Sequence, residues 1–103
     1  AEYDGVYTAI LAANDKLAIG ALKALREKGL DVPCDISLIG FDDIEWALHT
    51  DPPLTTVRVA KRQTGVLAAK LLIQAIADTE SHPAQIEIST RLIVRQSSGP
   101  ATR

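Results

Sequence analysis

The stretch TAILAANDKLAIGALKALREKG at residues 8–29, followed by ISLIGFDD at residues 36–43, decides the fold of this chain. The first six residues of the first stretch are uncharged, which predicts a strand buried on both faces, as in parallel sheets. Asn14 and Asp15 then favour a helix start, and apolar residues recur at helical spacing until Gly29, an expected helix end. The first four residues of the second stretch predict another strand. Together these elements form a strand–helix–strand unit, which in parallel sheets is a right-handed crossover.

The rest of the chain continues this alternation. Its long helix has few polar positions, of which Lys70, Gln74 and Asp78 form one narrow stripe, so we expect burial against more than one neighbour. After ISLIGFDD the predicted elements are a loop at 41–50 with a short helix at 45–48, a strand at 54–59, the long helix at 61–77, strands at 85–89 and 91–95, and a disordered tail at 97–103. The predicted class is α/β, a partial three-layer domain with a parallel sheet, in the order strand–helix–strand–loop–strand–helix–strand–strand.

Composition and charge exclude several functions. The chain has 103 residues and a net charge of −2, so it carries no electrostatic footprint for nucleic acid. Its single cysteine, Cys34, excludes an internal disulfide framework and the usual four-ligand zinc sites. Apolar runs stay far below the ~20 residues of a membrane span. Neither His49 nor His82 has metal-ligand spacing, and no nucleophile elbow or phosphate loop occurs. We therefore expect no catalytic residue, no metal and no cofactor.

Polar residues follow directly after the first two predicted strands. They are Asn14 with Asp15, and Asp42 with Asp43 in the turn that begins at Gly40. Ligands of open α/β sheets bind outside the carboxyl ends of the strands. If the strands are neighbours, Asn14 and Asp42 meet at one edge, where an amide and a carboxylate would suit a polyhydroxy or nucleobase-like ligand. Structural alternatives stand beside this interpretation, since Asn14 also suits a helix cap and Asp42 an ordinary Asx turn.

Several motifs occur together in an order and spacing that resemble one protein family. They are AAND at 12–15, Ala18 with GAL at 20–22, GLDVP at 29–33, DISLIGFDD at 35–43, PLTTV at 53–57, Gly65, and RLIVR at 91–95 with Ser97. Over about residues 8–98 the chain resembles the C-terminal part of LacI/GalR (lac-repressor/galactose-repressor) transcription regulators. The resemblance implies a two-lobed core similar to periplasmic sugar-binding proteins, with a small-molecule effector, often a sugar or nucleobase, between the lobes. It further implies a dimeric, cytoplasmic repressor whose N-terminal helix-turn-helix head, absent from this chain, binds DNA.

The same resemblance assigns roles to individual residues. Asn14 and Asp42 match positions that commonly contact the effector, and Asp43 and Lys61 are candidates for places next to it. The surface where C-terminal lobes pair matches the region around Ile19, Lys23, Trp46 and His49. By residue type alone, Trp46 also suits a loop anchor and His49 a solvent-exposed position.

The resemblance also implies how the chain is divided between lobes. Residues 1–58 and 85–98 would belong to the C-terminal lobe, 59–84 to a crossover helix that packs in the N-terminal lobe, and 99–103 to a tail. Because the rest of the N-terminal lobe lies outside this chain, we expect the chain to associate into a homodimer or a domain-swapped oligomer. For the same reason we expect the isolated chain to bind effector weakly or not at all.

Two positions depart from the family pattern, and other functions compete with a repressor. Val59 stands where many relatives have Gln near the ligand, so a typical pentose or hexose is not implied. Lys61 stands where some relatives have an aromatic residue, which favours an anionic effector. The alternative function is a periplasmic sugar-binding protein of a transporter, although PLTT and the ending at 91–97 look more like repressors. An enzyme on a doubly wound sheet is a further alternative, which the lack of a nucleophile–base pair disfavours.

Overall fold

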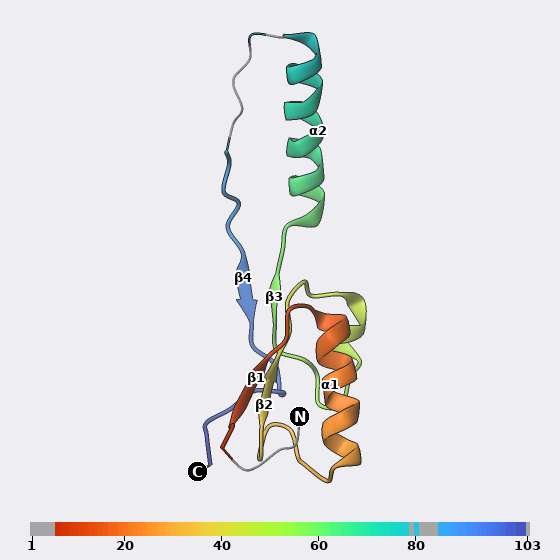
Figure 1. The fold of residues 1–103 in the computed structure, drawn as a ribbon, viewed down its shortest axis with the longest axis vertical. Helices are drawn as coiled ribbons and strands as arrows, with labels where there is room; N and C mark the ends of the chain where they lie inside the picture. Colours follow the sequence, from red (N-terminus) through yellow and green to blue (C-terminus); the bar gives the residue numbers. More distant parts are fainter. Residues whose placement is uncertain (1–5, 79, 81–84, 103) are drawn as a thin grey trace. The chain divides into compact units, whose positions relative to one another are not determined.

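The computed structural model describes residues 6–78, 80 and 85–102. In chain order its elements are β1 (Ala9–Leu11), α1 (Asp15–Glu27), β2 (Ser37–Ile39), the 3-10 helix η1 (Glu45–Leu48), β3 (Thr56–Arg58), α2 (Lys61–Ala77) and β4 (Arg91–Ile93) (Figure 1). The predicted α/β class is confirmed, and so are both long helices and the short helix at 45–48. Contacts divide the chain into two compact units, the first being Ala1–Arg58 with Arg91–Arg103 and the second Val59–Thr90.

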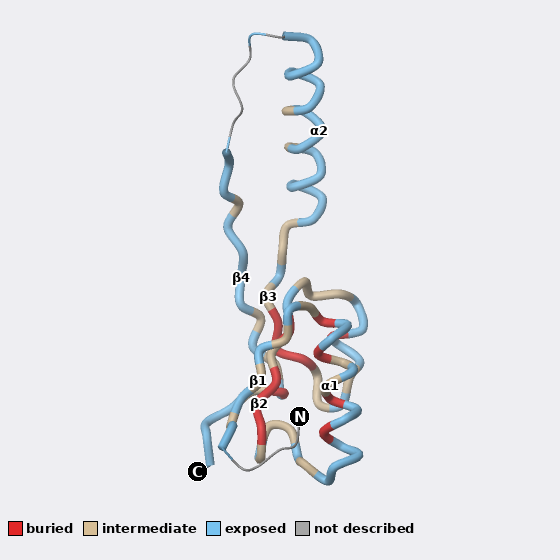
Figure 2. Tube along the Cα trace, in the orientation of Figure 1, coloured by how far each residue is buried: buried red, intermediate tan, exposed pale blue. Residues whose placement is uncertain are grey.

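Helix α1 begins where the sequence predicts because Asn14 caps it. Asn14 is extended, with a φ of −155°, and its Oδ1 accepts a hydrogen bond of 2.9 Å from the N–H of Leu17. Gly29 follows the helix with a φ of +74°, a left-handed conformation that glycine adopts without steric cost. The apolar positions of α1 that are buried are Ala18, Leu22 and Leu25. This buried stripe lies toward the strands of the first unit (Figure 2).

Strands β1 and β2 pair in parallel, with Ile10 opposite Leu38. The strand–helix–strand unit is therefore confirmed. Burial of the first strand on both faces was expected, and this expectation is wrong, because Leu11 is 75% exposed whereas Leu38 is fully buried. The physical reason is that α1 is the one α-helix of the first unit, so it covers a single face, and β2 is the one strand with which β1 pairs among the described residues.

Strand β3 continues the parallel arrangement along the end of β2. Isolated parallel bridges join the two segments, Ile39 with Thr55 and Asp42 with Arg58. The N–H groups of Gly40 and Asp42 donate to the carbonyls of Thr55 and Val57, each at 2.9 Å. Strand β4 then pairs with β3 in the antiparallel sense. The turn after β2 is thus held against β3 by main-chain hydrogen bonds, which limits how its side chains can be presented.

The core of the first unit lies between α1 and the strands. Its buried cluster consists of Ala18, Leu22, Leu38, Ala47 and Leu54. Ala47 belongs to η1, so this short helix closes the core next to α1. Burial of these side chains supplies most of the free energy that holds the unit together.

The chain after β4 is built into the first unit, so the predicted disorder is wrong at Ser97. This serine is fully buried. Its Oγ donates to the carbonyl of Leu38 at 2.6 Å and accepts from the N–H of Thr55 at 2.7 Å. Gly99 and Thr102 are also hydrogen-bonded, to Ser37 and Cys34. Small polar residues are typical of flexible tails, but here they satisfy buried main-chain groups that would otherwise lack partners.

The second unit consists of α2 and the segment after it. No residue of α2 is buried, and Leu72, Ile73 and Ile76 are 61%, 65% and 72% exposed. The predicted strand at 85–89 is wrong, because residues 85–90 have no regular structure. A strand exists only through hydrogen bonds to a neighbouring strand, and the described residues provide none there. His82 lies outside the described residues. None of the described helices is long and apolar enough to cross a membrane.

Candidate functional site

The loops that follow β1 and β2 are joined at one edge of the sheet. The N–H of Asp15 donates to the carbonyl of Phe41 at 3.0 Å. Asn14 precedes the donor residue and Asp42 follows the acceptor residue, so the structure brings the two predicted ligand residues to the same edge. Both are partly buried. This is the place at which open parallel sheets bind small molecules.

Asp15 is the residue that ties this edge together. Its carboxylate is fully buried. Oδ1 accepts a hydrogen bond of 2.6 Å from Oγ1 of Thr56, and Oδ2 accepts one of 2.8 Å from the N–H of Ile44. A buried carboxylate is retained at low cost only when its oxygens are hydrogen-bonded in this way. Asp15 therefore links the start of α1 to the turn after β2 and to β3.

Gly40 can only be glycine here, because Asp15 lies against it. A Cβ added at Gly40 would collide with Oδ1 of Asp15 and would lie 3.2 Å from its Cα. The same Cβ would lie 3.1 Å from Cδ2 of Leu54. The Asp15 carboxylate is fixed by its two hydrogen bonds and cannot move aside cheaply. The glycine at the end of β2 is therefore required by close approach of the helix start.

Asp42 adopts a backbone conformation that is unusual for its residue type. Its φ is +124°, which costs a non-glycine residue about 1–3 kcal/mol. The alternative of an ordinary Asx turn at Asp42 is wrong, because such a turn needs the N–H of Ile44, and that group donates to Asp15 instead. A strained aspartate at a position where glycine would be relaxed points to a role for its carboxylate.

Asn14 serves as a helix cap, as one of the two sequence interpretations predicted. The cap uses only Oδ1. The Nδ2 group of the same amide carries two further donors, which the cap leaves available. Capping and ligand contact are therefore compatible at this residue.

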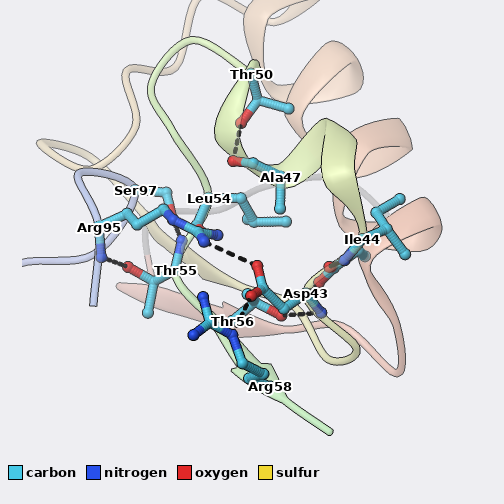
Figure 3. A network of polar contacts seen from close by, with 11 residues as sticks. Asp43, Ile44, Ala47, Thr50, Leu54, Thr55, Thr56, Arg58, Arg95 and Ser97 are labelled. Carbon is cyan, nitrogen blue, oxygen red and sulfur yellow. Dashed lines mark hydrogen bonds and ion pairs between the residues drawn. The ribbon is translucent and has the colours of Figure 1, made fainter. Parts of the chain in front are cut away.

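Asp43 binds two arginines with its two carboxylate oxygens. Oδ2 lies 2.7 Å from Nε of Arg58, and Oδ1 lies 2.8 Å from Nη2 of Arg95 (Figure 3). Burial raises the pKa of Asp43, but the hydrogen bonds and positive charges of Arg58 and Arg95 lower it by more, so the net pKa lies below the ordinary value. Its N–H also donates to Oγ1 of Thr56 at 3.3 Å. Both carboxylate oxygens and the N–H of Asp43 are therefore bound within the protein.

Sequence reasoning missed Asp15, Thr56, Arg58 and Arg95 as parts of this network. The available signals were weak. Asp15 is the acidic residue in the first turn of α1, a favourable place for a negative charge on electrostatic grounds alone. Nothing in the sequence separation between Asp43 and Arg95 predicts that the two meet.

The remaining predicted residues belong to other elements of the structure. Lys61 is the first residue of α2 and belongs to the second unit. Trp46 and His49, at η1, are exposed and form an edge-to-face ring pair with centroids 6.3 Å apart. Ile19 is partly buried and Lys23 exposed, both on α1. Among the described residues no group of three or more His, Cys, Asp or Glu side chains could hold a metal ion.

Comparison with known proteins places these features in a family. The chain matches the family model of the periplasmic binding protein-like domain over residues 4–98. It is 42% identical over 94 residues to the HTH-type transcriptional regulator MalR of Streptomyces coelicolor, a match covering 91% of this chain and 27% of that protein. The chain thus spans only about a quarter of the length of this relative.

Solved structures show the same relationship. A LacI family transcriptional regulator from Enterococcus faecium with bound ribose superposes with a TM-score of 0.83 at 33% identity, over 94% of this chain and 36% of that one. The lac repressor dimer bound to operator and the anti-inducer ONPF superposes with a TM-score of 0.79 at 36% identity, over 88% of this chain and 32% of that one. The family resemblance predicted from the motifs is confirmed. The chain belongs to the family of periplasmic binding protein-like domains, in the branch that occurs in LacI-type transcription regulators.

Proposed function

We propose that this chain is the effector-binding and dimerisation part of a small-metabolite-responsive LacI-type transcription repressor. The observation that carries the proposal lies at the carboxyl ends of the paired strands β1 and β2. There a hydrogen bond from the N–H of Asp15 to the carbonyl of Phe41 brings Asn14 and Asp42 to the same edge of the sheet. A regulator of this kind works beside DNA, so we place it in the cytoplasm. Binding to DNA would be carried by a segment outside this chain, since the chain itself has a net charge of −2.

The two ligand residues would divide the recognition of the effector. The carboxylate of Asp42 would accept hydrogen bonds from two neighbouring hydroxyls, and the Nδ2 of Asn14 would donate to a third oxygen. The backbone strain at Asp42 supports this role, because it keeps a carboxylate where a glycine would fold more easily. Asp43 would stay beside the effector as support for Asp42 rather than as a contact, since both of its oxygens bind arginines.

The effector that we propose is a polyhydroxy molecule with a negative charge. The bound sugar in the Enterococcus faecium relative supports a polyhydroxy ligand. Lys61 favours an anionic derivative of such a molecule, and Val59 in place of Gln speaks against an unmodified pentose or hexose. D-Ribose and D-ribose 5-phosphate therefore form a matched pair of probes. Tighter binding of the phosphate would support the role of Lys61, and binding of neutral sugars alone would contradict it.

A titration of the 15N-labelled chain followed by NMR tests the site directly. We expect the probes to shift the amide signals at 14–15 and 40–43, with weak affinity because only one side of the site is present. Asp42→Asn should weaken binding by about 10-fold or more, since hydrogen bonds to a charged group contribute about 1.5–3 kcal/mol. Asp51→Asn is the matched control, because the Asp51 side chain is 97% exposed. Unchanged affinity in Asp42→Asn would remove this residue from the site.

We also propose the division between lobes that the family pattern implies. Residues 1–58 and 85–98 would belong to the C-terminal lobe, 59–84 to the crossover helix of the other lobe, and 99–103 to a tail. The boundary between the two contact units after Arg58 supports the first crossing, whereas at the return the second unit extends to Thr90, beyond residue 84. The relatives are transcription regulators, so the transporter alternative is not favoured and no catalytic role is proposed.

Association of the chain would use one of two exposed surfaces. The pairing surface around Ile19, Lys23, Trp46 and His49 includes an indole that is 67% exposed. The apolar side of α2, with Leu72 61% exposed, would instead serve a domain-swapped oligomer. Sedimentation velocity distinguishes them, since Trp46→Ser should release monomer in the first case and Leu72→Ser in the second. A monomeric wild-type chain at high concentration would contradict both forms of association.

A further inference from the structure

The carboxylate of Asp43 connects three separate segments of the first unit. It lies in the turn after β2, and it pairs with Arg58 at the end of β3 and with Arg95 just after β4. The Asp43 and Arg95 side chains are only 9% and 8% exposed, whereas Arg58 is 50% exposed. The ion pair with Arg95 is therefore largely shielded from water, and the ion pair with Arg58 is partly exposed to it. Figure 3 shows both guanidinium groups turned toward the carboxylate.

The two arginines mark the strands that carry the chain into and out of the second unit. Arg58 is the last residue of the first unit before Val59 begins the second, and β4 begins at Arg91, where the chain re-enters the first unit. Arg58 and Arg91 are opposite each other in the β3–β4 ladder. Arg95 is also held at its other end, because its Nη1 donates to the carbonyl of Leu54 at 3.0 Å. Asp43 thus binds to both connecting strands through rigid, hydrogen-bonded guanidinium groups.

Asp43 also shares a stretch of backbone with positive φ values with its neighbour Asp42. Its φ of +57° follows directly on the φ of +124° at Asp42. The N–H of Asp43 donates to Thr56, whose hydroxyl donates in turn to Asp15. The Asp42 backbone is thus joined directly to a residue whose N–H and carboxylate are bound to other segments, namely to Thr56 and to the two arginines.

We propose that Asp43 is a positioning residue that couples the conformation of the Asp42 turn to the β3 and β4 strands through its paired contacts with Arg58 and Arg95. When an effector engages Asp42, this link passes the change to both connections with the second unit. That functional meaning rests on the proposed function. The mechanical link itself can be tested without any effector.

Hydrogen exchange in a double-variant experiment tests the link. Asp42→Gly relaxes the positive φ and acts as a perturbation of the turn. In the otherwise unchanged chain it should alter the exchange rates of the amides at 91–95 by at least about 2-fold, the lower limit for residues in one ion-pair network. In the Asp43→Asn background this response should fall by at least about 2-fold, and the remainder would pass through the main-chain hydrogen bond from Asp42 to Val57. The amide of Val57 should respond in both backgrounds, because its own carbonyl accepts directly from Asp42.

Asp51→Asn is the control background, in which the response at 91–95 must persist, because Asp51 makes only an exposed contact with Arg26 at 3.8 Å. If Asp43→Asn does not fold, Arg95→Lys replaces it. Lysine keeps the charge but cannot donate to Asp43 and Leu54 together, so the response should fall by at least about 2-fold. An undiminished response in either variant would overturn the proposal. A titration in which D-ribose and D-ribose 5-phosphate shift no amide would contradict a ribose-type effector and leave the exchange result standing.

Discussion

The two helices of this chain have similar lengths and opposite surroundings. Helix α1 buries Ala18, Leu22 and Leu25 against the strands of its own unit, and its charged residues other than Asp15 are exposed. Helix α2 has apolar residues around most of its circumference, and none of its residues is buried. An apolar helix therefore does not imply a covering partner within the same stretch of chain. Helix α1 has its partner surface within this chain, whereas α2 displays a surface suited to one.

The two units also differ in the interactions that stabilise them. The first unit combines a buried cluster with a network of hydrogen bonds and ion pairs around Asp15 and Asp43. A helix of 17 residues without buried contacts is marginal in water, because nucleation is costly and each residue adds little. We therefore expect stability to be concentrated in the first unit.

The largest difference should come from truncating one leucine in each unit. Leu38→Ala should destabilise the chain by about 3 kcal/mol, because Leu38 is fully buried in the core. Leu72→Ala should change the free energy of unfolding by less than about 0.5 kcal/mol, since its side chain is 61% exposed. Urea unfolding at low protein concentration measures both. A large loss in Leu72→Ala that grows with protein concentration would show that α2 is buried by association.

A second pair of variants compares two glycines. Gly40→Ala should cost about 2 kcal/mol, because the added methyl group collides with the fixed carboxylate of Asp15. Gly65→Ala should instead stabilise α2 by about 1 kcal/mol, since nothing lies within 4 Å of the added group and alanine favours the helix. Thermal unfolding followed by circular dichroism distinguishes the signs. Equal effects of the two changes would contradict the account of Gly40.

Acidification should weaken the first unit through Asp43. The pKa of Asp43 is lowered in the folded state, so its ionised form stabilises the fold above the unfolded-state pKa of about 3.9. This contribution is lost as the pH falls below that value toward the folded-state pKa. Urea unfolding at a series of pH values should show a steeper loss in the wild-type chain than in Asp43→Asn. Parallel curves for the two proteins would show that Asp43 contributes nothing to the pH dependence.

The smallest effect concerns the strain at Asp42. Asp42→Gly should stabilise the first unit by up to about 1 kcal/mol, because relief of a positive φ is partly offset by the greater flexibility of unfolded glycine. The same variant should lose effector binding, which would separate stability from function at one residue. Asp31→Gly is a control, since Asp31 has no positive φ and should lose stability on the same change. A destabilised Asp42→Gly would mean that the carboxylate serves the fold.

Much of the fold was predictable from local signals. The bounds of α1 follow from the Asn14 cap and from Gly29, and α2 begins at Lys61 and ends at Ala77, as its periodicity indicates. The failures have one cause. The strand expected at 85–89 has no hydrogen-bonding partner among the described residues, and Leu11 is exposed because one helix covers one face. Each of these outcomes depends on a neighbour, which a local pattern does not contain.

The candidate site shows the same limit at the level of single residues. Its position was predictable, because polar residues after neighbouring parallel strands meet at one edge. The roles of its acids were not. Asp15, Asp42 and Asp43 are the same residue type within 29 positions, yet their roles differ. Asp15 binds the start of α1 to β3, Asp42 has a strained backbone, and Asp43 pairs with two arginines.

By itself the sequence determined the helices, the order of the elements and the turn that ends in Asp42 and Asp43, because caps, periodicity and glycine act over a few residues. Only the tertiary structure decided which carboxylate is buried, how Ser97 enters the sheet, and that α2 remains uncovered. The reason is that burial and ion pairing depend on segments far apart in the chain: Asp43 and Arg95 are brought together by the pairing of β3 with β4, and their separation in the sequence carries no sign of it.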